Sequence, residues 1–288
     1  MQTVKLNNGI EMPILGYGVF QVSPEECERC VLDAISVGYR LIDTAQAYYN
    51  EEGVGNAIAK CGVPRDELFL TTKVWITNAG EAKATRSIDE SLRKLRTDYI
   101  DLLLIHQPFS DYPGTWRAME KALKAGKVRA IGLSNFYPDR FVDMAECAEI
   151  KPAVNQLKTN VFSQQWDAEA EMNLYNTRIM AWAPLAQGDP DLLTNSVLTA
   201  LAERYDKTVQ QVALRYLVQR GIIAIPKSTH IERMKQNLDV FDFALTPKDM
   251  ESIRPLDKPT DFRWSHRNPE LVKFLLNYDK QFNPDNKK

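Results

Sequence analysis

Short apolar runs recur along the chain, and amphipathic segments separate them. The runs lie at residues 14–19, 41–43, 69–74, 100–105, 128–133, 153–156, 179–183 and 222–225. They are apolar without alternation, which is typical of strands that are covered on both faces. Parallel strands joined by helical crossovers produce this pattern. With eight strand–helix units of roughly 25–30 residues each, the sequence predicts an α/β fold, a closed (β/α)₈ TIM barrel rather than an open doubly wound sheet.

Helical periodicity marks the segments between the apolar runs. Within residues 81–95, apolar side chains from Ala84 to Leu95 recur on one helical face. Comparable patterns predict further helices at residues 115–125, 138–148, 166–177 and 208–220.

The N-terminal sequence TVKLNNGIEMP has a different character. Two short strand-like pieces flank Asn7, Asn8 and Gly9, which favour a tight turn. We expect this β-hairpin to plug the bottom of the barrel. We also expect residues 1–288 to form one barrel domain, since no Pro/Gly-rich linker interrupts the repeat.

The composition limits the function classes. The chain has 288 residues, of which 44% are hydrophobic and 26% charged, as in an ordinary globular protein. A net charge of −2 does not favour nucleic acid or an anionic membrane surface as a partner. There is no apolar run of about 18 residues, and the N-terminus lacks the apolar centre of a signal peptide. We therefore expect a cytoplasmic protein and, without an apolar surface segment, a monomer.

Cys27 and Cys30 form a CxxC pair, a spacing found in redox and metal sites. The pair also fits a helix that has Ser23 as its N-cap, Pro24 at its first position and Gly38 at its end. On that helix both thiols lie in an apolar stripe. No second pair completes a zinc site, so we favour core packing over redox or metal use and expect no metal.

The carboxyl ends of the strands are the most informative positions, because barrels of this kind carry their active sites there. Those ends hold Asp43, Lys73, His106, Gln107, Ser134, Asn135, Asn155, Gln156, Trp182, Lys227 and Ser228. A charged residue at the end of an apolar strand is costly unless it is paired. We therefore expect Asp43 and Lys73, on neighbouring strands, to form an ion pair.

Tyr48 lies five residues beyond Asp43, so a short loop can bring its hydroxyl to this pair. An adjacent ammonium stabilises a phenolate and lowers the pKa of the phenol from its usual value of about 10. A phenol tuned in this way can donate a proton to a developing alkoxide. His106 alone would be read as a satisfied core histidine. Beside Asp43, Lys73 and Tyr48 we favour a catalytic role for it.

Several segments resemble, in order, the motifs of the aldo-keto reductase family. They are GYRLIDTAQAYYNEEGVG, LLLIHQP, GKVRAIGLSNF, PAVNQ and IPKSTHIERMKQNLDVFDFALT. The resemblance covers nearly the whole chain, about residues 4–273. The C-terminal sequence DFRWSHRNPELVKFLLN resembles that of compact microbial members of the diketogluconate and methylglyoxal reductase kind.

The resemblance places a catalytic tetrad on Asp43, Tyr48, Lys73 and His106. It implies hydride transfer from a reduced nicotinamide to an aldehyde or ketone. Tyr48 would protonate the oxygen, Lys73 and Asp43 would tune it, and His106 would orient the carbonyl. For Tyr49, surface packing and substrate contact remain equally open.

The resemblance also implies NADPH as the cofactor. Ser134, Asn135 and Gln156 would hold the nicotinamide amide, which needs both donors and acceptors. Trp182, where the family usually has tyrosine, would stack on the ring. Leu185 and Gln187 would contact the pyrophosphate from the loop WAPLAQG, which departs from the more common Ser-Pro-Leu-Gly.

The preference for NADPH over NADH would come from the segment after the eighth apolar run. Lys227, Ser228 and Arg233 would bind the adenosine 2′-phosphate beside a helix start, and Asn237 would contact adenine. No GxGxxG motif occurs, so a Rossmann site is not expected.

Candidate walls of the substrate pocket are Phe20, Trp75, His106 and Gln107. Gln107 makes the pocket more polar than in many animal members, which carry an aromatic residue there. Short loops favour an open pocket and broad tolerance. The expected substrates are small aldehydes, 2-oxoaldehydes such as methylglyoxal, and keto-sugars such as diketogluconate.

We expect the C-terminal segment to form a loop or helix over the mouth of the barrel. Trp264 and either His266 or Arg267 should lie near the pocket.

Two other functions are compatible with the fold. One is an isomerase or aldolase in which Lys73 forms a Schiff base, but this needs a neutral lysine, and Asp43 beside it argues against that. The other is an NADP(H)-binding or sensing barrel with little or no catalytic activity.

Overall fold

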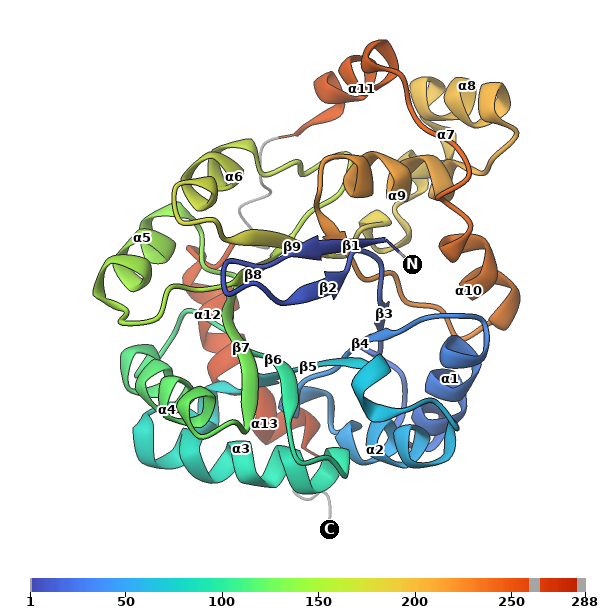
Figure 1. Ribbon diagram of the computed structural model, residues 1–288. Coiled ribbons are helices and arrows are strands. Elements are labelled where there is room, and N and C mark those ends of the chain that lie inside the picture. Colours follow the sequence, from blue (N-terminus) through green and yellow to red (C-terminus); the bar gives the residue numbers. More distant parts are fainter. Residues whose placement is uncertain (1, 259–264, 284–288) are drawn as a thin grey trace.

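A parallel sheet of eight strands forms the centre of the computed structural model, which describes residues 2–258 and 265–283 (Figure 1). Its strands are β3 (Tyr17–Gly18), β4 (Leu41–Asp43), β5 (Phe69–Val74), β6 (Ile100–Ile105), β7 (Val128–Ser134), β8 (Val154–Lys158), β9 (Arg178–Trp182) and β10 (Ile223–Ala224). They pair in sequence order from β3 to β10. The succession of apolar runs therefore gives the spatial order of the strands directly.

Backbone hydrogen bonds close this sheet into a barrel. The Gly16 N–H donates to the Ala224 carbonyl at 2.8 Å, and the Ala224 N–H donates to the Ile14 carbonyl at 2.9 Å. The predicted TIM barrel is confirmed. The first and last strands are shorter than the apolar runs 14–19 and 222–225 that predicted them, because regular pairing here is limited to a few residues.

Helices surround the barrel, as the crossover pattern requires (Figure 1). They are α1 (Pro24–Ser36), α2 (Glu51–Lys60), α3 (Glu81–Leu95), α4 (Tyr112–Lys124), α5 (Pro138–Cys147), α6 (Trp166–Asn173), α7 (Pro190–Thr194), α8 (Ser196–Tyr205), α9 (Val209–Gln219), α10 (Ile231–Leu238), α11 (Pro247–Ile253), α12 (Pro269–Leu276) and α13 (Tyr278–Phe282). Short 3₁₀ turns lie at η1 (Gln46–Tyr48), η2 (Arg65–Glu67), η3 (Ile76–Asn78), η4 (Ala186–Gly188) and η5 (Arg254–Leu256). Helix α4 begins earlier than predicted because the Asp111 side chain caps it by accepting from the Gly114 N–H at 2.8 Å.

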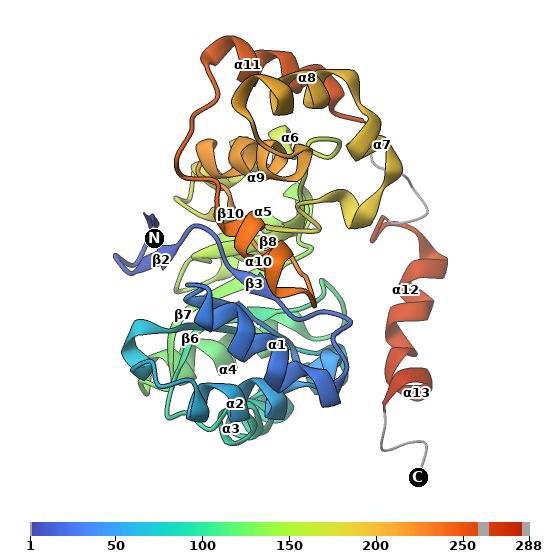
Figure 2. The same cartoon turned by 90° about the vertical axis from the view of Figure 1, so that its right-hand side faces the viewer.

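The N-terminal hairpin consists of β1 (Thr3–Lys5) and β2 (Glu11–Pro13), which pair antiparallel. Its Leu6 and Met12 are buried with Leu41, Leu102 and other side chains of the barrel interior. In Figure 2 the hairpin and the helices α12 and α13 lie on opposite sides of the barrel. The hairpin therefore covers the bottom, and the C-terminal helices lie on the side of the mouth, as predicted.

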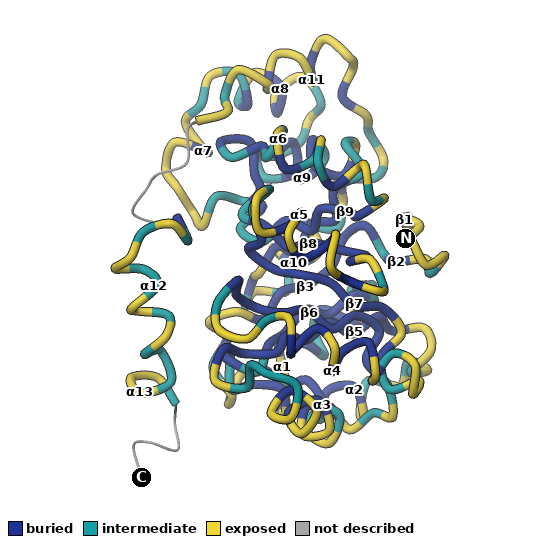
Figure 3. The backbone as a smooth tube through the Cα atoms, turned by 90° about the vertical axis from the view of Figure 1, so that its left-hand side faces the viewer, coloured by how far each residue is buried: buried dark blue, intermediate teal, exposed yellow. Residues whose placement is uncertain are grey.

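Burial follows the layers of the barrel: the strands are buried, and the outer faces of the helices are exposed (Figure 3). Cys27 and Cys30 are unpaired, fully buried and part of the larger core cluster. Burial raises the pKa of the Cys27 thiol to about 12, which disfavours the reactive thiolate. In the described part of the chain, no helix combines the length and apolarity that a membrane crossing requires.

Gly55 provides a test of the packing between α2 and α3. A Cβ at this position would lie 2.2 Å from the Lys94 carbonyl oxygen, which is backbone and cannot move aside. Helix propensity alone would favour Gly55→Ala by about 1 kcal/mol. We expect the opposite sign, a loss of about 1–3 kcal/mol in the free energy of unfolding, because of overpacking. Urea denaturation of the native protein and of Gly55→Ala measures this difference in the free energy of unfolding.

Ala59→Gly, at an exposed position of the same helix, is the control. It should lose only the propensity difference of about 1 kcal/mol. A Gly55→Ala variant at least as stable as the native protein would contradict the close approach of α2 to α3.

Candidate active site

A buried ion pair lies at the carboxyl ends of β4 and β5. Lys73 Nζ is 2.7 Å from Asp43 Oδ2, and the exposed fractions of the two residues are 0% and 2%. Lys73 also donates to the Thr44 carbonyl at 2.8 Å, and Gln156 Nε2 donates to Asp43 Oδ1 at 2.8 Å. The predicted pair is present, and both of its charges have further hydrogen-bond partners.

Burial and the mutual attraction of the two charges shift the pKa values of this pair in opposite directions. Desolvation raises the pKa of the Asp43 carboxyl and lowers the pKa of Lys73, while each charge favours the charged form of the other. We assign the charged forms, because the hydrogen bonds from Lys73 and Gln156 meet both carboxylate oxygens.

Tyr48 completes the group from η1. Its hydroxyl accepts a hydrogen bond from Lys73 Nζ at 3.3 Å, and its ring is half-buried. The position of η1 depends on Gln46, a residue that the sequence analysis missed. Gln46 Oε1 accepts from the Trp75 N–H and from Asn78 Nδ2, both at 2.9 Å. Its polar side chain within the short loop DTAQAYYN was the available signal.

The expected lowering of the Tyr48 pKa was wrong in direction. Burial, followed by the negative charge of Asp43, raises the pKa of Tyr48 well above its ordinary value. Burial is the largest cause of this rise in the pKa, and Lys73 does not offset it, because Lys73 lies closer to the carboxylate of Asp43 than to the phenol. Tyr48 is therefore a protonated phenol at neutral pH, which is the form that a proton donor requires.

His106 follows β6 and faces the same group. Its ring centroid is 5.6 Å from that of Tyr48 and 4.9 Å from that of Trp75. Burial, then the charge of Lys73, lowers the pKa of His106 well below its ordinary value, so the ring is neutral. Its Nδ1 is buried and makes no hydrogen bond to the described residues. The histidine is therefore not a satisfied core residue.

Tyr49 forms a hydrogen bond to the C-terminal helix α13. It adopts a left-handed backbone conformation with φ 56°, and its hydroxyl donates to Asp279 Oδ1 at 2.5 Å. Thr77 Oγ1 donates to the other oxygen of Asp279 at 2.7 Å. Tyr49 thus fastens α13 to the barrel, which favours the packing interpretation over substrate contact.

The predicted pocket walls lie around this centre. The ring centroid of Phe20 is 5.0 Å from that of Tyr48, with the two rings tilted by 52°, and Phe20 is 42% exposed. Trp75 lies between His106 and Tyr278, whose ring is 5.5 Å away. Gln107 is buried, and its Oε1 accepts from Asn135 Nδ2 at 3.3 Å, so part of its polarity is used within the protein.

Of the C-terminal residues expected near the mouth, Trp264 lies outside the described residues. The ring of His266 packs 5.8 Å from Phe109 and 5.9 Å from Tyr137. Arg267 pairs instead with Asp139 on α5, at 3.3 Å.

The four residues predicted to hold a nicotinamide are close together. Asn135, with φ 65°, donates to the His106 carbonyl at 3.1 Å and to Ser134 Oγ at 3.2 Å. Trp182 Nε1 donates to Asn135 Oδ1 at 3.0 Å. Gln156 joins the same side of the mouth through its bond to Asp43. The set is therefore connected to the Asp43–Lys73 pair.

The loop after β9 contains Leu185 and Gln187. Leu185 is half-buried against the core, whereas Gln187 is exposed. Ala183, Ala186 and Gln187 all have positive φ values, of 51°, 52° and 56°. This conformation is uncommon outside glycine and is concentrated at functional sites.

The predicted phosphate site lies where β10 leads into α10. Ser228 Oγ accepts from the His230 N–H at 3.1 Å, and the Ser228 carbonyl accepts from the Tyr17 hydroxyl at 2.6 Å. Lys227 and Arg233 are exposed, and neither forms an ion pair with a described residue. Asn237 is buried in α10. The helix start thus offers two uncommitted cations and backbone N–H groups to an anion.

Comparison with known proteins identifies the family of this chain. The model of the aldo/keto reductase family matches residues 14–258. A glyoxal reductase of Bacillus subtilis is 46% identical over 89% of this chain and 93% of its own. The methylglyoxal reductase DkgA of Yersinia pestis is 39% identical over 88% and 92%.

A solved structure extends the similarity to three dimensions. An aldo-keto reductase of Bombyx mori in complex with NADP is 36% identical, with a TM-score of 0.86 over 95% of this chain and 96% of that one. Because the family match and these relatives cover most of the chain, the protein belongs to the aldo/keto reductase family.

Proposed function

We propose that this protein reduces aldehydes and ketones to alcohols with NADPH, and that Tyr48 is the proton donor. The observation that carries the proposal is the hydrogen bond from Lys73 to the Tyr48 hydroxyl. An ammonium has three hydrogens to donate and no acceptor. Lys73 directs them to Asp43, to the Thr44 carbonyl and to Tyr48. Since Tyr48 accepts this bond, its own O–H is available to donate to a substrate oxygen.

The charges around Tyr48 also favour proton transfer from Tyr48 to the substrate oxygen. When Tyr48 gives up its proton, the resulting phenolate lies beside the Lys73 ammonium, which stabilises it. The buried carboxylate of Asp43 keeps Lys73 charged and in place. The negative charge that develops on Tyr48 in the transition state would therefore lie next to groups that are already oriented to stabilise it.

His106 is suited to bind the carbonyl rather than to supply the proton. A neutral imidazole has one N–H donor, and the low pKa of His106 keeps it neutral. A hydrogen bond from this ring to the carbonyl oxygen would orient the substrate toward Tyr48. The same low pKa argues against an imidazolium as the acid.

The chain's residues fit NADPH, which when bound supplies the hydride. The amide groups of Asn135 and Gln156 and the hydroxyl of Ser134 suit a carboxamide, and Trp182 offers a flat apolar surface. Lys227 and Arg233 suit the 2′-phosphate, with Ser228 and Asn237 beside them. Leu185 and Gln187 would contact the pyrophosphate. The NADP complex of the Bombyx mori relative supports this choice.

The proposed substrates are small aldehydes, 2-oxoaldehydes such as methylglyoxal, and keto-sugars. The names of the glyoxal and methylglyoxal reductase relatives support the first two classes. Schiff-base chemistry at Lys73 is disfavoured, because an ammonium with three acceptors is a poor nucleophile.

Tyr48→Phe tests the proton donor. Removing the hydroxyl should lower kcat for methylglyoxal reduction by about 10²–10⁴-fold, the usual contribution of general acid catalysis. NADPH binding, measured by fluorescence titration, should be nearly unchanged. The matched control is Tyr49→Phe, which removes the neighbouring hydroxyl and should stay within a few-fold of the native rate. Similar losses in both variants would show that the proton donor is misassigned.

If the native protein binds NADPH but reduces no carbonyl compound in a broad panel, the non-catalytic binding or sensing barrel becomes the better description.

Arg233→Ala tests the basis of cofactor choice. Loss of a charge-assisted hydrogen bond should weaken NADPH binding by roughly tenfold to a hundredfold. NADH lacks the 2′-phosphate, so its dissociation constant should change little. Lys235→Ala on the same helix, which removes a cation paired with Glu232, is the control. Equal weakening of both cofactors by Arg233→Ala would refute the 2′-phosphate assignment.

The charge state of His106 is directly measurable by NMR titration of the imidazole resonances. The signal that disappears in His106→Gln should remain that of a neutral ring as the pH falls below 6.5, because the folded-state pKa is lowered. The unfolded chain then takes up this proton first, so the free energy of unfolding should decrease as the pH falls below that value. A midpoint near 6.5 for this signal would contradict the buried neutral ring.

A further inference from the structure

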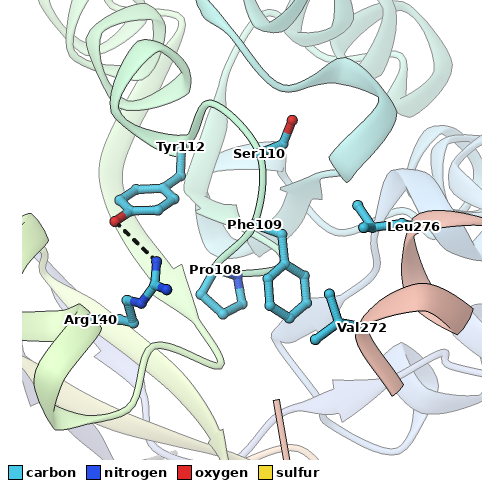
Figure 4. A pocket seen from close by; sticks show the side chains of 7 residues that line it. All are labelled: Pro108, Phe109, Ser110, Tyr112, Arg140, Val272 and Leu276. Carbon is cyan, nitrogen blue, oxygen red and sulfur yellow. Dashed lines mark hydrogen bonds between the residues drawn. The ribbon is translucent and has the colours of Figure 1, made fainter. Parts of the chain in front are cut away.

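A second pocket, of about 420 Å³, lies beside the candidate active site, and the proposed function does not use it (Figure 4). It lies between the loop after β6, the start of α4, α5 and the C-terminal helix α12. Its lining consists of Pro108, Phe109, Ser110, Tyr112, Arg140, Val272 and Leu276. A part of the C-terminal segment thus forms one wall, and the barrel forms the other.

The lining divides into an apolar part and a polar part. Phe109 and Pro108 lie between Val272 and Leu276 on one side and the Tyr112–Arg140 pair on the other (Figure 4). Val272 and Leu276 are one helical turn apart on α12, and Leu276 is 46% exposed. Binding of an apolar ligand would remove this exposed apolar surface from water, which is favourable.

The polar part carries the guanidinium of Arg140, which contacts Tyr112. Arg140 Nη1 donates to the Tyr112 hydroxyl at 3.5 Å, and Arg140 forms no ion pair with a described residue. Two acids on the same helix have partners other than Arg140: Asp143 accepts from the Tyr112 hydroxyl at 2.7 Å, and Asp139 pairs with Arg267 at 3.3 Å. A guanidinium presents a fork of donors that matches a carboxylate.

One side chain connects this pocket with the reaction centre. Phe109 lines the pocket and also packs in the cluster that contains Trp75, Tyr48 and Tyr278. Trp75 in turn contacts the ring of His106. Phe109 therefore borders both the pocket and the aromatic cluster beside His106, so a substrate that runs along Phe109 would occupy both.

We propose that this pocket binds the far end of aldehyde substrates that have an apolar chain and a terminal carboxylate, with Arg140 as the specificity-determining residue for that carboxylate. The proposal rests on the proposed carbonyl reduction and adds a substrate class to it, the ω-oxo carboxylates. The chain lies along Phe109, Val272 and Leu276. The carboxylate meets Arg140, and the aldehyde reaches His106 and Tyr48.

The test is steady-state kinetics on two homologous series of straight-chain aldehydes, one ending in a carboxylate and one in a methyl group. Above a threshold chain length, kcat/KM should be higher for the carboxylate than for the methyl-ended aldehyde of equal length. Arg140→Gln should remove this preference, with a threefold to tenfold rise in KM and little change in kcat. Arg140→Lys, which keeps the charge, should restore part of it. High salt should weaken the preference in the native protein, since exposed charges are screened.

Two controls separate this proposal from the reductase activity itself. Methylglyoxal is too short to reach Arg140, so its reduction should be the same in Arg140→Gln as in the native protein. Arg117→Gln, an exposed arginine on α4 that pairs with Glu81, should leave both series unchanged. Methylglyoxal turnover without any chain length at which Arg140 discriminates the two series would overturn the proposal. Absence of all carbonyl reduction would instead refute the proposed function.

Discussion

The buried ion pair between Lys73 and Asp43 is the interaction on which the rest of the site depends. Each ion loses several kcal/mol of hydration when it is buried, and the mutual attraction compensates only if further hydrogen bonds satisfy both groups. Here Gln156, the Thr44 carbonyl and the Tyr48 hydroxyl supply those bonds. The pair therefore fixes side chains from β4, β5 and β8 in one arrangement.

This arrangement also explains why the loop after β4 is so tightly held. Asn50 Oδ1 accepts from Thr44 Oγ1 at 2.8 Å, and its Nδ2 donates to the carbonyls of Val19 and Val22. Gln46 ties the other side of the loop to Trp75. Tyr48 needs such support, because a small displacement of a catalytic group greatly lowers the reaction rate. Asn50 and Gln46 therefore both position Tyr48.

The sequence predicted the fold well because the signal is repeated. Each apolar run is weak evidence by itself, but eight of them with amphipathic segments between are compatible with few architectures. The strand ends likewise predicted the Asp43–Lys73 pair, since two opposite charges at neighbouring ends must meet. The shortness of β3 and β10 was not predictable, because regular pairing depends on backbone geometry, whereas apolarity extends beyond it.

What sequence reasoning could not supply was the balance of opposing effects. The direction of the Tyr48 pKa shift depends on burial and on whether Lys73 lies closer to a carboxylate or to the phenol, and spacing contains neither quantity. The role of Tyr49 was undecided for the same reason, since its partner Asp279 is more than two hundred positions away in sequence. The pocket around Arg140 is likewise formed by segments that are distant along the chain.

The way in which the barrel closes has a consequence for its local unfolding. The seam between the first and last strands is joined by backbone hydrogen bonds from Gly16, Gly18 and Ala224, whereas β5, β6 and β7 pair over more residues, so this seam is an expected starting point for local opening. Tyr17 crosses the seam to reach Ser228, at the edge of the proposed phosphate site. A cofactor phosphate bound there would lie next to the hydrogen bond that crosses the seam. Binding of that phosphate would therefore also stabilise the closure of the barrel.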